Sequence, residues 1–233
     1  MENKIAILVP CGNSVDPKAF QSGMLLSANA AEEYKVEFIG VTERMLVHTS
    51  RNVLAEGFLG TDCDWAFWLD SDMILPPRTI RIMMKWAKEL NSKFLTGVYY
   101  QRHGEHKPVI GIKDESLVKF DDEYSTVSVT PSEGCKLPFK VDACGFGCVL
   151  IHRDVFKDMV KPYFFNGMTK TGKEFSEDYH FCMNARKLGI EIWAIPELDC
   201  GHIGEPKIVF RKDCQIEKKE LANVGFYESR KQN

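Results

Sequence analysis

Short apolar runs alternate with helix-like segments along the first hundred residues of the chain. The runs are nearly unbroken, as strands buried on both faces of a parallel sheet usually are, and they cover residues 5–9, 35–41, 65–69 and 94–100. Between them, segments that begin at Pro17, at residue 48 and at Pro77 read as helices. This alternation predicts an α/β fold, with a mostly parallel central sheet flanked by helices.

Each predicted helix should bury one face. The helix from Pro17 carries four apolar residues that we expect to face the core: Phe20, Met24, Leu25 and Ala28. The helix from Pro77 fits the i, i+3, i+4, i+7 spacing with Ile80, Met83, Met84 and Ala87. A later helix, capped by Ser176 and ended by Gly189, has Phe181, Ala185 and Leu188 on its apolar face.

The pattern changes after Gln101. Residues 102–140 mix short β-like runs with Gly, Pro and charged residues, which predicts a β-rich or irregular insertion. Alternation resumes over residues 141–153, a short helix is expected at 154–160, and residues 190–195 form the last clear strand. We therefore expect one domain over residues 1–204, with 102–140 as a variable insertion, followed by a tail over residues 205–233.

Composition narrows the class of protein. A chain of 233 residues with 44% hydrophobic and 27% charged residues is typical of a globular protein, and its net charge of -3 gives no general reason to bind nucleic acid or membranes. The apolar run near the N-terminus is too short for a signal peptide, and we expect no membrane span. The 8 cysteines are scattered without a dense disulfide pattern, which predicts a cytoplasmic protein.

Two carboxylates separated by Ser71 end the apolar run 65–69. If the strand stays extended, Asp70 and Asp72 point to the same side, at the strand end where open α/β sheets bind ligands. Carboxylate oxygens suit Mg2+ or Mn2+, which usually bind through one or two carboxylates plus substrate phosphates. The alternative is a simple polar turn, because Asp and Ser favour turns and Pro76-Pro77 follows soon after.

Three other groups could carry chemistry. Glu177-Asp178 lies in the first turn of a predicted helix, where a carboxylate could act as a general base or could only complement the helix dipole. His202 follows the last strand as a candidate metal ligand or as a packed histidine. Residues 145–147, Gly-Phe-Gly, precede a strand and so do not form a dinucleotide fingerprint, but they could let the backbone approach a ligand.

Two familiar site types have little support. Cys144, Cys148, Cys200 and His202 could be read as a zinc site, but their spacing matches no strong zinc pattern. The sequence also has no Gly-x4-Gly-Lys phosphate loop, which argues against a P-loop NTPase.

These motifs occur in a familiar order. Ser50-Arg51-Asn52 opens a helix, Leu69-Asp70-Ser71-Asp72 ends a strand, Gly145 to Arg153 leads into a short helix, and Ser176-Glu177-Asp178 precedes the last strand and His202. Over residues 4 to 204 this order resembles GT-A-fold glycosyltransferases, most closely those of glycosyltransferase family 2.

The resemblance implies a role for each matching position. Asp70, Asp72 and His202 would form the site of Mn2+ or Mg2+, with Asp70 also near the ribose of the nucleotide. Asp178 would be the catalytic base, with Glu177 beside it. The donor, a nucleotide-diphosphate sugar, would be held by Arg51, Asn52, Asp70, Ser71, Gly145, Phe146 and Gly147. The insertion 102–140 and the tail match no part of the family pattern, so we expect acceptor specificity there.

The residue types agree with this chemistry. A metal ion stabilises charge on a leaving diphosphate, and a carboxylate base suits an inverting displacement by an acceptor hydroxyl on a saccharide, a protein or a hydroxylated nucleobase. Two other readings stay open. A nucleotidyltransferase could use the same aspartate pair, although residues 10–14 lack the basic side chains expected for a triphosphate loop. A non-catalytic nucleotide-sugar binding protein could share the fold.

Overall fold

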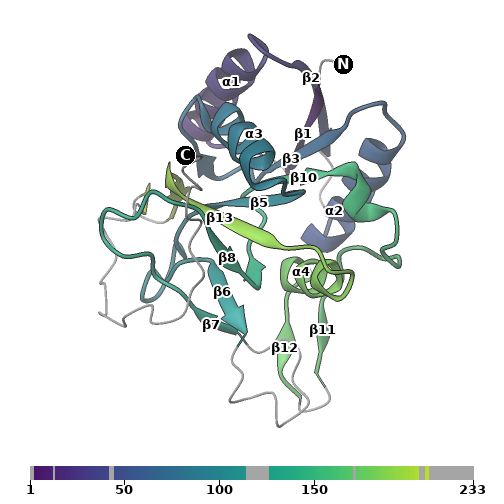
Figure 1. Ribbon diagram of the computed structural model, residues 1–233, viewed down its shortest axis with the longest axis vertical. Helices are drawn as coiled ribbons and strands as arrows, with labels where there is room; N and C mark the ends of the chain where they lie inside the picture. Colours follow the sequence, from purple (N-terminus) through teal and green to yellow (C-terminus); the bar gives the residue numbers. More distant parts are fainter. Residues whose placement is uncertain are drawn as a thin grey trace, which may run out of the picture.

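A seven-stranded sheet forms the centre of the computed structural model, in the order β2-β1-β3-β10-β5-β13-β8 (Figure 1). The structure describes residues 3–12, 14–41, 45–113, 126–169, 172–204 and 208–209. The strands of this sheet are β1 (Lys4–Pro10), β2 (Lys35–Val41), β3 (Trp65–Leu69), β5 (Phe94–Val98), β8 (Phe139–Val141), β10 (Cys148–His152) and β13 (Ile192–Asp199). Part of the predicted insertion and nearly all of the predicted tail lie outside the described residues.

Most strands of the sheet run in one direction. β1 is parallel to β2 and β3, and β5 is parallel to β13. β10 is antiparallel to both of its neighbours, β3 and β5, so these two also share a direction, and β8 is antiparallel to β13. The prediction of an α/β fold with a mostly parallel sheet is confirmed, and β10 and β8 make the sheet mixed.

Helices cover both faces of the sheet, which is why β3 is apolar at all five positions. Helices α1 (Pro17–Ala30) and α3 (Thr79–Leu90) pack on one face, where Ile7 and Phe67 belong to the same core. Helices α2 (Val47–Leu59) and α4 (Glu177–Lys187) pack on the other, with Leu8 and Trp68. Figure 1 shows α1 and α3 together on one side of the sheet and α4 on the other.

Three small sheets and a short 3-10 helix complete the part of the chain that the structure describes. They consist of β4 (Met73–Ile74) with β14 (Gly201–Ile203) and β15 (Ile208–Val209), of β6 (Ile110–Lys113) with β7 (Thr126–Ser128) and β9 (Ala143–Cys144), and of β11 (Gly167–Met168) with β12 (Glu174–Phe175). The helix predicted at 154–160 is instead a 3-10 turn, Arg153–Phe156. The β-rich character predicted for the insertion agrees with β6 and β7.

The predicted buried face of α1 is wrong. Phe20, Met24 and Leu25 are exposed at 62%, 58% and 51%, and Ala28 is exposed too. The buried positions are Ala19, Ser22, Leu26 and Ala30, mostly small side chains that let the helix lie close to its neighbours. The Ser22 hydroxyl donates to the carbonyl of Leu75 at 3.0 Å and accepts from the Leu75 amide at 2.8 Å. The buried face of α1 was not predicted because its residues are mostly small or polar, whereas the prediction relied on large apolar residues.

The predicted buried faces of α3 and α4 agree with the structure at all but one position. All four predicted core residues of α3 are buried, as are Phe181 and Ala185 of α4. Leu188 is 43% exposed because α4 ends at Lys187, one residue before it. Ser176 is the N-cap residue as predicted, although its hydroxyl bonds the carboxylate of Asp178 and no backbone amide.

The structure bears on two further predictions, the absence of a membrane span and the state of the cysteines. Among the described residues, no helix is long and apolar enough to cross a membrane. The seven cysteines of the described ranges are free thiols. The cytoplasmic location stays a prediction.

The neighbouring residues Leu25 and Leu26 test the corrected face of α1. We expect Leu26→Ala to lower the free energy of unfolding by about 2–5 kcal/mol, because it opens a cavity in the core. Leu25→Ala should change it by about 0.5 kcal/mol or less, because this side chain is half in solvent. Urea unfolding of both variants measures the difference, and equal losses would contradict this assignment of the buried face.

Candidate active site

The chain turns immediately after β3. The amide of Asp70 donates to the carbonyl of Gly147 at 3.4 Å, and the amide of Met73 donates to the carbonyl of Asp70 at 3.2 Å. The prediction that Asp70 and Asp72 share one side of an extended strand is therefore wrong. Asp and Ser favour turns, and the two carboxylates lie in a turn between β3 and β4. As a result they face different partners.

Arg51 lies at the centre of a buried carboxylate cluster. Its Nη2 donates to both carboxylate oxygens of Asp70 at 3.0 Å, and its Nη1 donates to Oε1 of Glu177 at 2.8 Å. Oδ2 of Asp178 lies 4.0 Å from Nη1, and the guanidinium carbon lies 5.3 Å from the ring centroid of Phe146. Arg51 thus connects α2, the end of β3 and the start of α4.

The charges of this cluster do not balance. Burial would lower the pKa of Arg51, but Asp70, Asp178 and Glu177 together raise it, so the guanidinium stays charged. Burial raises the pKa of Asp70 and of Glu177, and Arg51 opposes the rise in both. One cation facing three carboxylates leaves two uncompensated negative charges when all three are ionised, which favours a further cation nearby.

Asp72 lies against a histidine and an arginine. Its Oδ2 accepts a hydrogen bond from Nη1 of Arg102 at 2.6 Å and lies 3.4 Å from Nε2 of His202. Burial works to raise the pKa of Asp72, but His202 and Arg102 hold it below its usual value. Burial lowers the pKa of His202, but the hydrogen bonds to Asp72 and to the carbonyl of Tyr100, together with the charge of Asp72, outweigh burial and raise it.

The backbone explains why Asp72 and His202 meet. β4 pairs with β14 so that His202 lies opposite Met73, and the amide of Ile203 donates to the carbonyl of Asp72 at 2.8 Å. Nδ1 of His202 lies 2.8 Å from the carbonyl oxygen of Tyr100, so Nδ1 carries a proton and donates it. Nε2 therefore faces Asp72, and it is the ring nitrogen that a metal could use.

The donor set of Asp72 and His202 fits a divalent ion. One carboxylate oxygen and one imidazole nitrogen face each other, and the second ring nitrogen is anchored to a carbonyl, as it usually is in histidines that bind metals. Asp70 is not gathered with them, because both of its oxygens bind Arg51. Of the predicted three-ligand set, Asp72 and His202 form a close pair, and Asp70 is bound to Arg51 instead.

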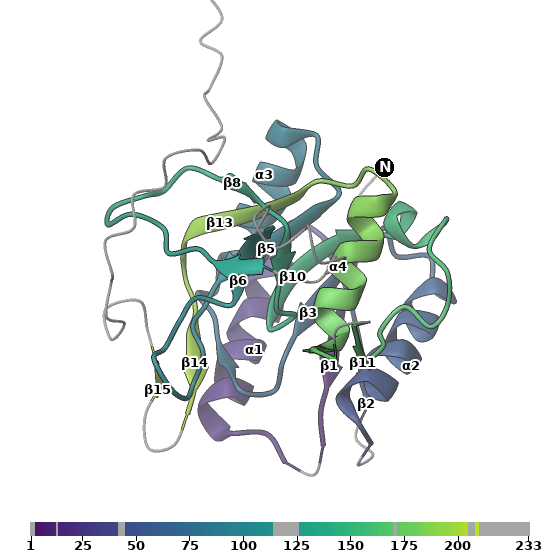
Figure 2. The same ribbon diagram turned by 90° about the horizontal axis from the view of Figure 1, so that it is seen from below.

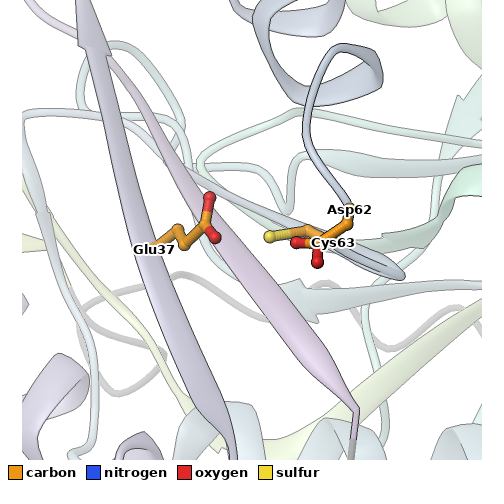
Figure 3. Close-up of side chains that lie close together, drawn as sticks. All are labelled: Glu37, Asp62 and Cys63. Atoms are coloured by element: carbon orange, nitrogen blue, oxygen red, sulfur yellow. The ribbon is translucent and has the colours of Figure 1, made fainter.

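Within the part of the chain that the structure describes, one group places three possible ligand atoms within 4.8 Å of one another, and it lies elsewhere (Figure 3). It consists of Glu37 on β2 and of Asp62 and Cys63, which precede β3, at the opposite end of the strands from Asp70. Asp62 is already paired with Lys4. Burial raises the pKa of the Cys63 thiol, which therefore stays protonated. This group does not resemble a ready cation site.

The Gly-Phe-Gly segment is buried against the site. A Cβ on Gly147 would lie 3.0 Å from Sδ of Met73 and 3.0 Å from Cζ of Tyr99, and a Cβ on Gly145 would overlap the Tyr99 hydroxyl. The amide of Gly147 donates to that hydroxyl at 3.1 Å. Phe146 is buried beneath Arg51 in an aromatic core with Trp68, Phe164 and Phe181. The close approach that requires both glycines is to Tyr99, and a role toward the donor stays a prediction.

Two predicted donor-binding residues have different surroundings. The amide nitrogen of Asn52 donates to the carbonyls of His48 and Phe164, and its oxygen accepts from the amide of Phe164, so the side chain ties α2 to a neighbouring segment. Ser71 lies partly exposed in the turn between the two aspartates. Of the two, Ser71 is the better placed to reach a ligand.

Asp178 and Glu177 occupy unlike positions in the first turn of α4. The side chain of Glu177 is 8% exposed and bonds Arg51, whereas that of Asp178 is 17% exposed. Oδ1 of Asp178 accepts from the Ser176 hydroxyl and, at 3.0 Å, from the amide of Tyr179. In Figure 2 the first turn of α4 lies next to β11. Asp178 is thus the more exposed of the two carboxylates, and its Oδ2 is not hydrogen-bonded by Ser176 or by the Tyr179 amide.

Three residues of this site were not predicted from the sequence: Tyr99, Tyr100 and Arg102. All three follow β5, a neighbour of β10 and β13 in the sheet. Their position in the sequence could have indicated this, because polar residues just after a predicted parallel strand lie at the same edge of the sheet as Asp70. They were instead assigned to the end of a strand and to the insertion.

Replacing Arg51 tests the buried cluster. We expect Arg51→Met to lower the free energy of unfolding by about 3–5 kcal/mol at pH 7, because Asp70 and Glu177 lose their cation. Arg81→Met, which removes a partly exposed arginine that pairs with Glu32 and Glu33, should cost about 1 kcal/mol or less.

The same variant should depend on pH. The pKa of both carboxylates is raised in the folded parent and should rise further without Arg51, so the folded state binds more protons than the unfolded state. Arg51→Met should therefore regain stability as the pH falls from 7 toward about 4, the unfolded pKa of such groups. Urea unfolding at several pH values measures this, and a deficit that does not shrink would contradict the charge explanation.

Comparison with known proteins identifies the fold. No known protein family matches the sequence, and no curated relative was found. Among solved structures, A197 from STIV aligns over 94% of this chain and 99% of its own, with 18% identity and a TM-score of 0.58. GalNAc-T7, crystallised with UDP, GalNAc and Mn2+, aligns over 92% of this chain and 45% of its own, with 11% identity and a TM-score of 0.52. The chain has a GT-A-like fold.

Proposed function

We propose that the protein is a metal-dependent glycosyltransferase that moves a sugar from a nucleotide-diphosphate sugar to an acceptor hydroxyl, with inversion. The observation that carries the proposal is the pairing of Asp72 with His202, whose second ring nitrogen is fixed by the carbonyl of Tyr100. This pair lies at the end of β3, and Arg51 links the same strand end to Asp178. The GT-A-like fold supports the assignment, since GalNAc-T7 was crystallised with a nucleotide, a sugar and Mn2+.

Asp72 and His202 would hold Mn2+ or Mg2+ through one oxygen and one nitrogen. Bound there, the ion would supply positive charge to the leaving diphosphate. The surplus negative charge around Arg51 favours the same cation, because Asp70, a member of that cluster, lies near enough to Asp72 for the charge of Asp72 to raise the pKa of Asp70. Asp70, whose carboxylate is held in place by Arg51, would help to orient the donor.

Arg51 has a positioning role in this proposal. Only 3% of the residue is exposed, and its two terminal nitrogens already bind two carboxylates, so the guanidinium is not open to the nucleotide. It fixes the distance between the end of β3 and the start of α4. In that way it sets the metal side and the base side of the reaction relative to each other.

Asp178 would act as the general base. Its Oδ2 would take the proton of the acceptor hydroxyl while the acceptor oxygen bonds the anomeric carbon and the bond from that carbon to the diphosphate breaks. Oδ1, held by Ser176 and by the Tyr179 amide, keeps the carboxylate in one orientation. One displacement of this kind inverts the anomeric centre and needs no covalent intermediate.

A screen of nucleotide sugars with Mn2+ tests the proposed class of reaction. Metal-dependent hydrolysis of one donor, or its transfer to an added saccharide or peptide, would support a glycosyltransferase. Binding without turnover would favour a nucleotide-sugar binding protein. Release of pyrophosphate from nucleoside triphosphates would favour a nucleotidyltransferase and would contradict the proposal.

The metal assignment predicts unequal effects of the acidic residues. Asp72→Ala should abolish Mn2+-dependent binding of the nucleoside diphosphate, and His202→Ala should weaken it, because each removes a ligand of the same ion. Asp62→Ala is the matched control from the other acidic cluster and should bind as the parent does. Calorimetry on the folded variants measures this. Unchanged affinity in Asp72→Ala would overturn the assignment.

The base assignment predicts a loss of rate without a comparable loss of stability. Asp178→Asn keeps the shape but cannot take the proton, so transfer should fall by about 10²–10⁴-fold. Its melting temperature and donor affinity should stay near those of the parent, because the Asp178 carboxylate lies 4.0 Å from Arg51, farther away than the hydrogen-bonded carboxylates of Asp70 and Glu177. Glu177→Gln should affect stability more and rate less. Near-parental turnover of Asp178→Asn would refute the inverting mechanism proposed here.

A further inference from the structure

Asp72 presents the same oxygen to two groups. Oδ2 is 2.6 Å from Nη1 of Arg102 and 3.4 Å from Nε2 of His202. The shorter distance is that of a strong charge-assisted hydrogen bond. The guanidinium of Arg102 therefore takes the oxygen that a metal ion would also need.

Arg102 reaches this position from a hairpin after β5. The amide of Gln101 donates to the carbonyl of Lys107 at 2.9 Å, and the amide of Val109 donates to the carbonyl of Tyr99 at 2.8 Å. Gly104 and His106 form the turn, with φ of 72° and 51°. The same hairpin supplies the carbonyl of Tyr100 that orients His202. One short hairpin thus contacts both members of the proposed metal pair.

Arg102 differs from Arg51 in what holds it. The side chain of Arg102 is 48% exposed and reaches Asp72 from the solvent side, whereas that of Arg51 is 4% exposed. A long, half-exposed side chain can turn away at little cost, since surface ion pairs contribute little to stability. A guanidinium has no lone pair to offer a metal, and its charge repels one, so Arg102 competes with a divalent ion for this oxygen.

We infer that Arg102 is a resident cation of the metal site: it holds Asp72 in the metal-free protein, leaves when a divalent ion binds, and then contacts the diphosphate of the donor. The exchange keeps Asp72 paired with a positive charge in both states. It also moves a guanidinium, whose fork of donors matches phosphate oxygens, to the edge of the site where the diphosphate arrives. The second step rests on the proposed function, and the first requires only that Asp72 and His202 bind a divalent ion.

Titration of the ligand-free protein with Mn2+, followed by the electron paramagnetic resonance signal of free Mn2+, tests the first step. Arg102→Ala and Arg102→Gln should both bind Mn2+ about tenfold more tightly than the parent, equivalent to about 1.4 kcal/mol, because the competing charge is gone. Arg81→Ala, which removes a partly exposed arginine that pairs with Glu32 and Glu33 on another part of the chain, should bind as the parent does. Circular dichroism checks that all variants fold.

Other outcomes of this titration are decisive as well. Equal or weaker Mn2+ binding by both Arg102 variants would overturn the inference while leaving the metal site intact, provided that Asp72→Ala still abolishes binding. If Arg102→Ala binds Mn2+ more tightly and Arg102→Gln does not, the hydrogen bond to Asp72 and not the positive charge would be the competitor of the metal ion. That result would also overturn the inference. If the parent and all Arg102 variants fail to bind Mn2+, the proposed metal site fails, and this inference fails with it.

The second step is tested by calorimetry at saturating Mn2+ with UDP, GDP, CDP and dTDP. For the nucleotide that binds the parent, Arg102→Ala should weaken binding about tenfold, although it binds the metal more tightly. Opposite changes in metal and nucleotide affinity are the signature of a residue that exchanges partners. Unchanged nucleotide affinity would overturn the contact with the diphosphate.

Discussion

Arg51 is a buried cation shared by three carboxylates, and the geometry of the candidate site depends on it. Its hydrogen bonds to Asp70 and Glu177 join the end of a central strand to the first turn of a helix more than a hundred residues later in the chain. Removing a charge from such a cluster is costly, because the remaining charges stay buried without a partner. The arrangement therefore fixes where Asp178 lies relative to the turn that carries Asp72.

The antiparallel strand β10 gives the site its second constraint. It lies between β3 and β5, and its first residue, Cys148, pairs with Leu69. The Gly-Phe-Gly segment just before β10 consequently packs beside Asp70, with Phe146 under Arg51 and Gly147 against Tyr99. Aromatic packing below and a carboxylate cluster above thus hold one another in place.

Asp72 and Arg102 are more exposed than the cluster around Arg51. Asp72, His202 and Arg102 come from a turn, a short strand and a hairpin, and they are partly exposed. Rigid elements carry the buried cluster, whereas these shorter segments carry the groups that would meet the donor. This division would suit the proposed reaction, in which the base stays in place while a cation and a diphosphate enter and leave.

The sequence by itself determined the class of fold and most of the candidate residues. Alternating apolar runs and helical spacing specify buried strands and amphipathic helices locally, and carboxylates after a strand mark the edge where ligands bind. It did not determine the packed face of α1, because Ala19 and Ser22 fit closely without being strongly apolar. Nor did it determine that Arg51 is buried or that Arg102 pairs with Asp72. Those contacts join segments far apart in the chain, and only the tertiary structure decides which charges meet.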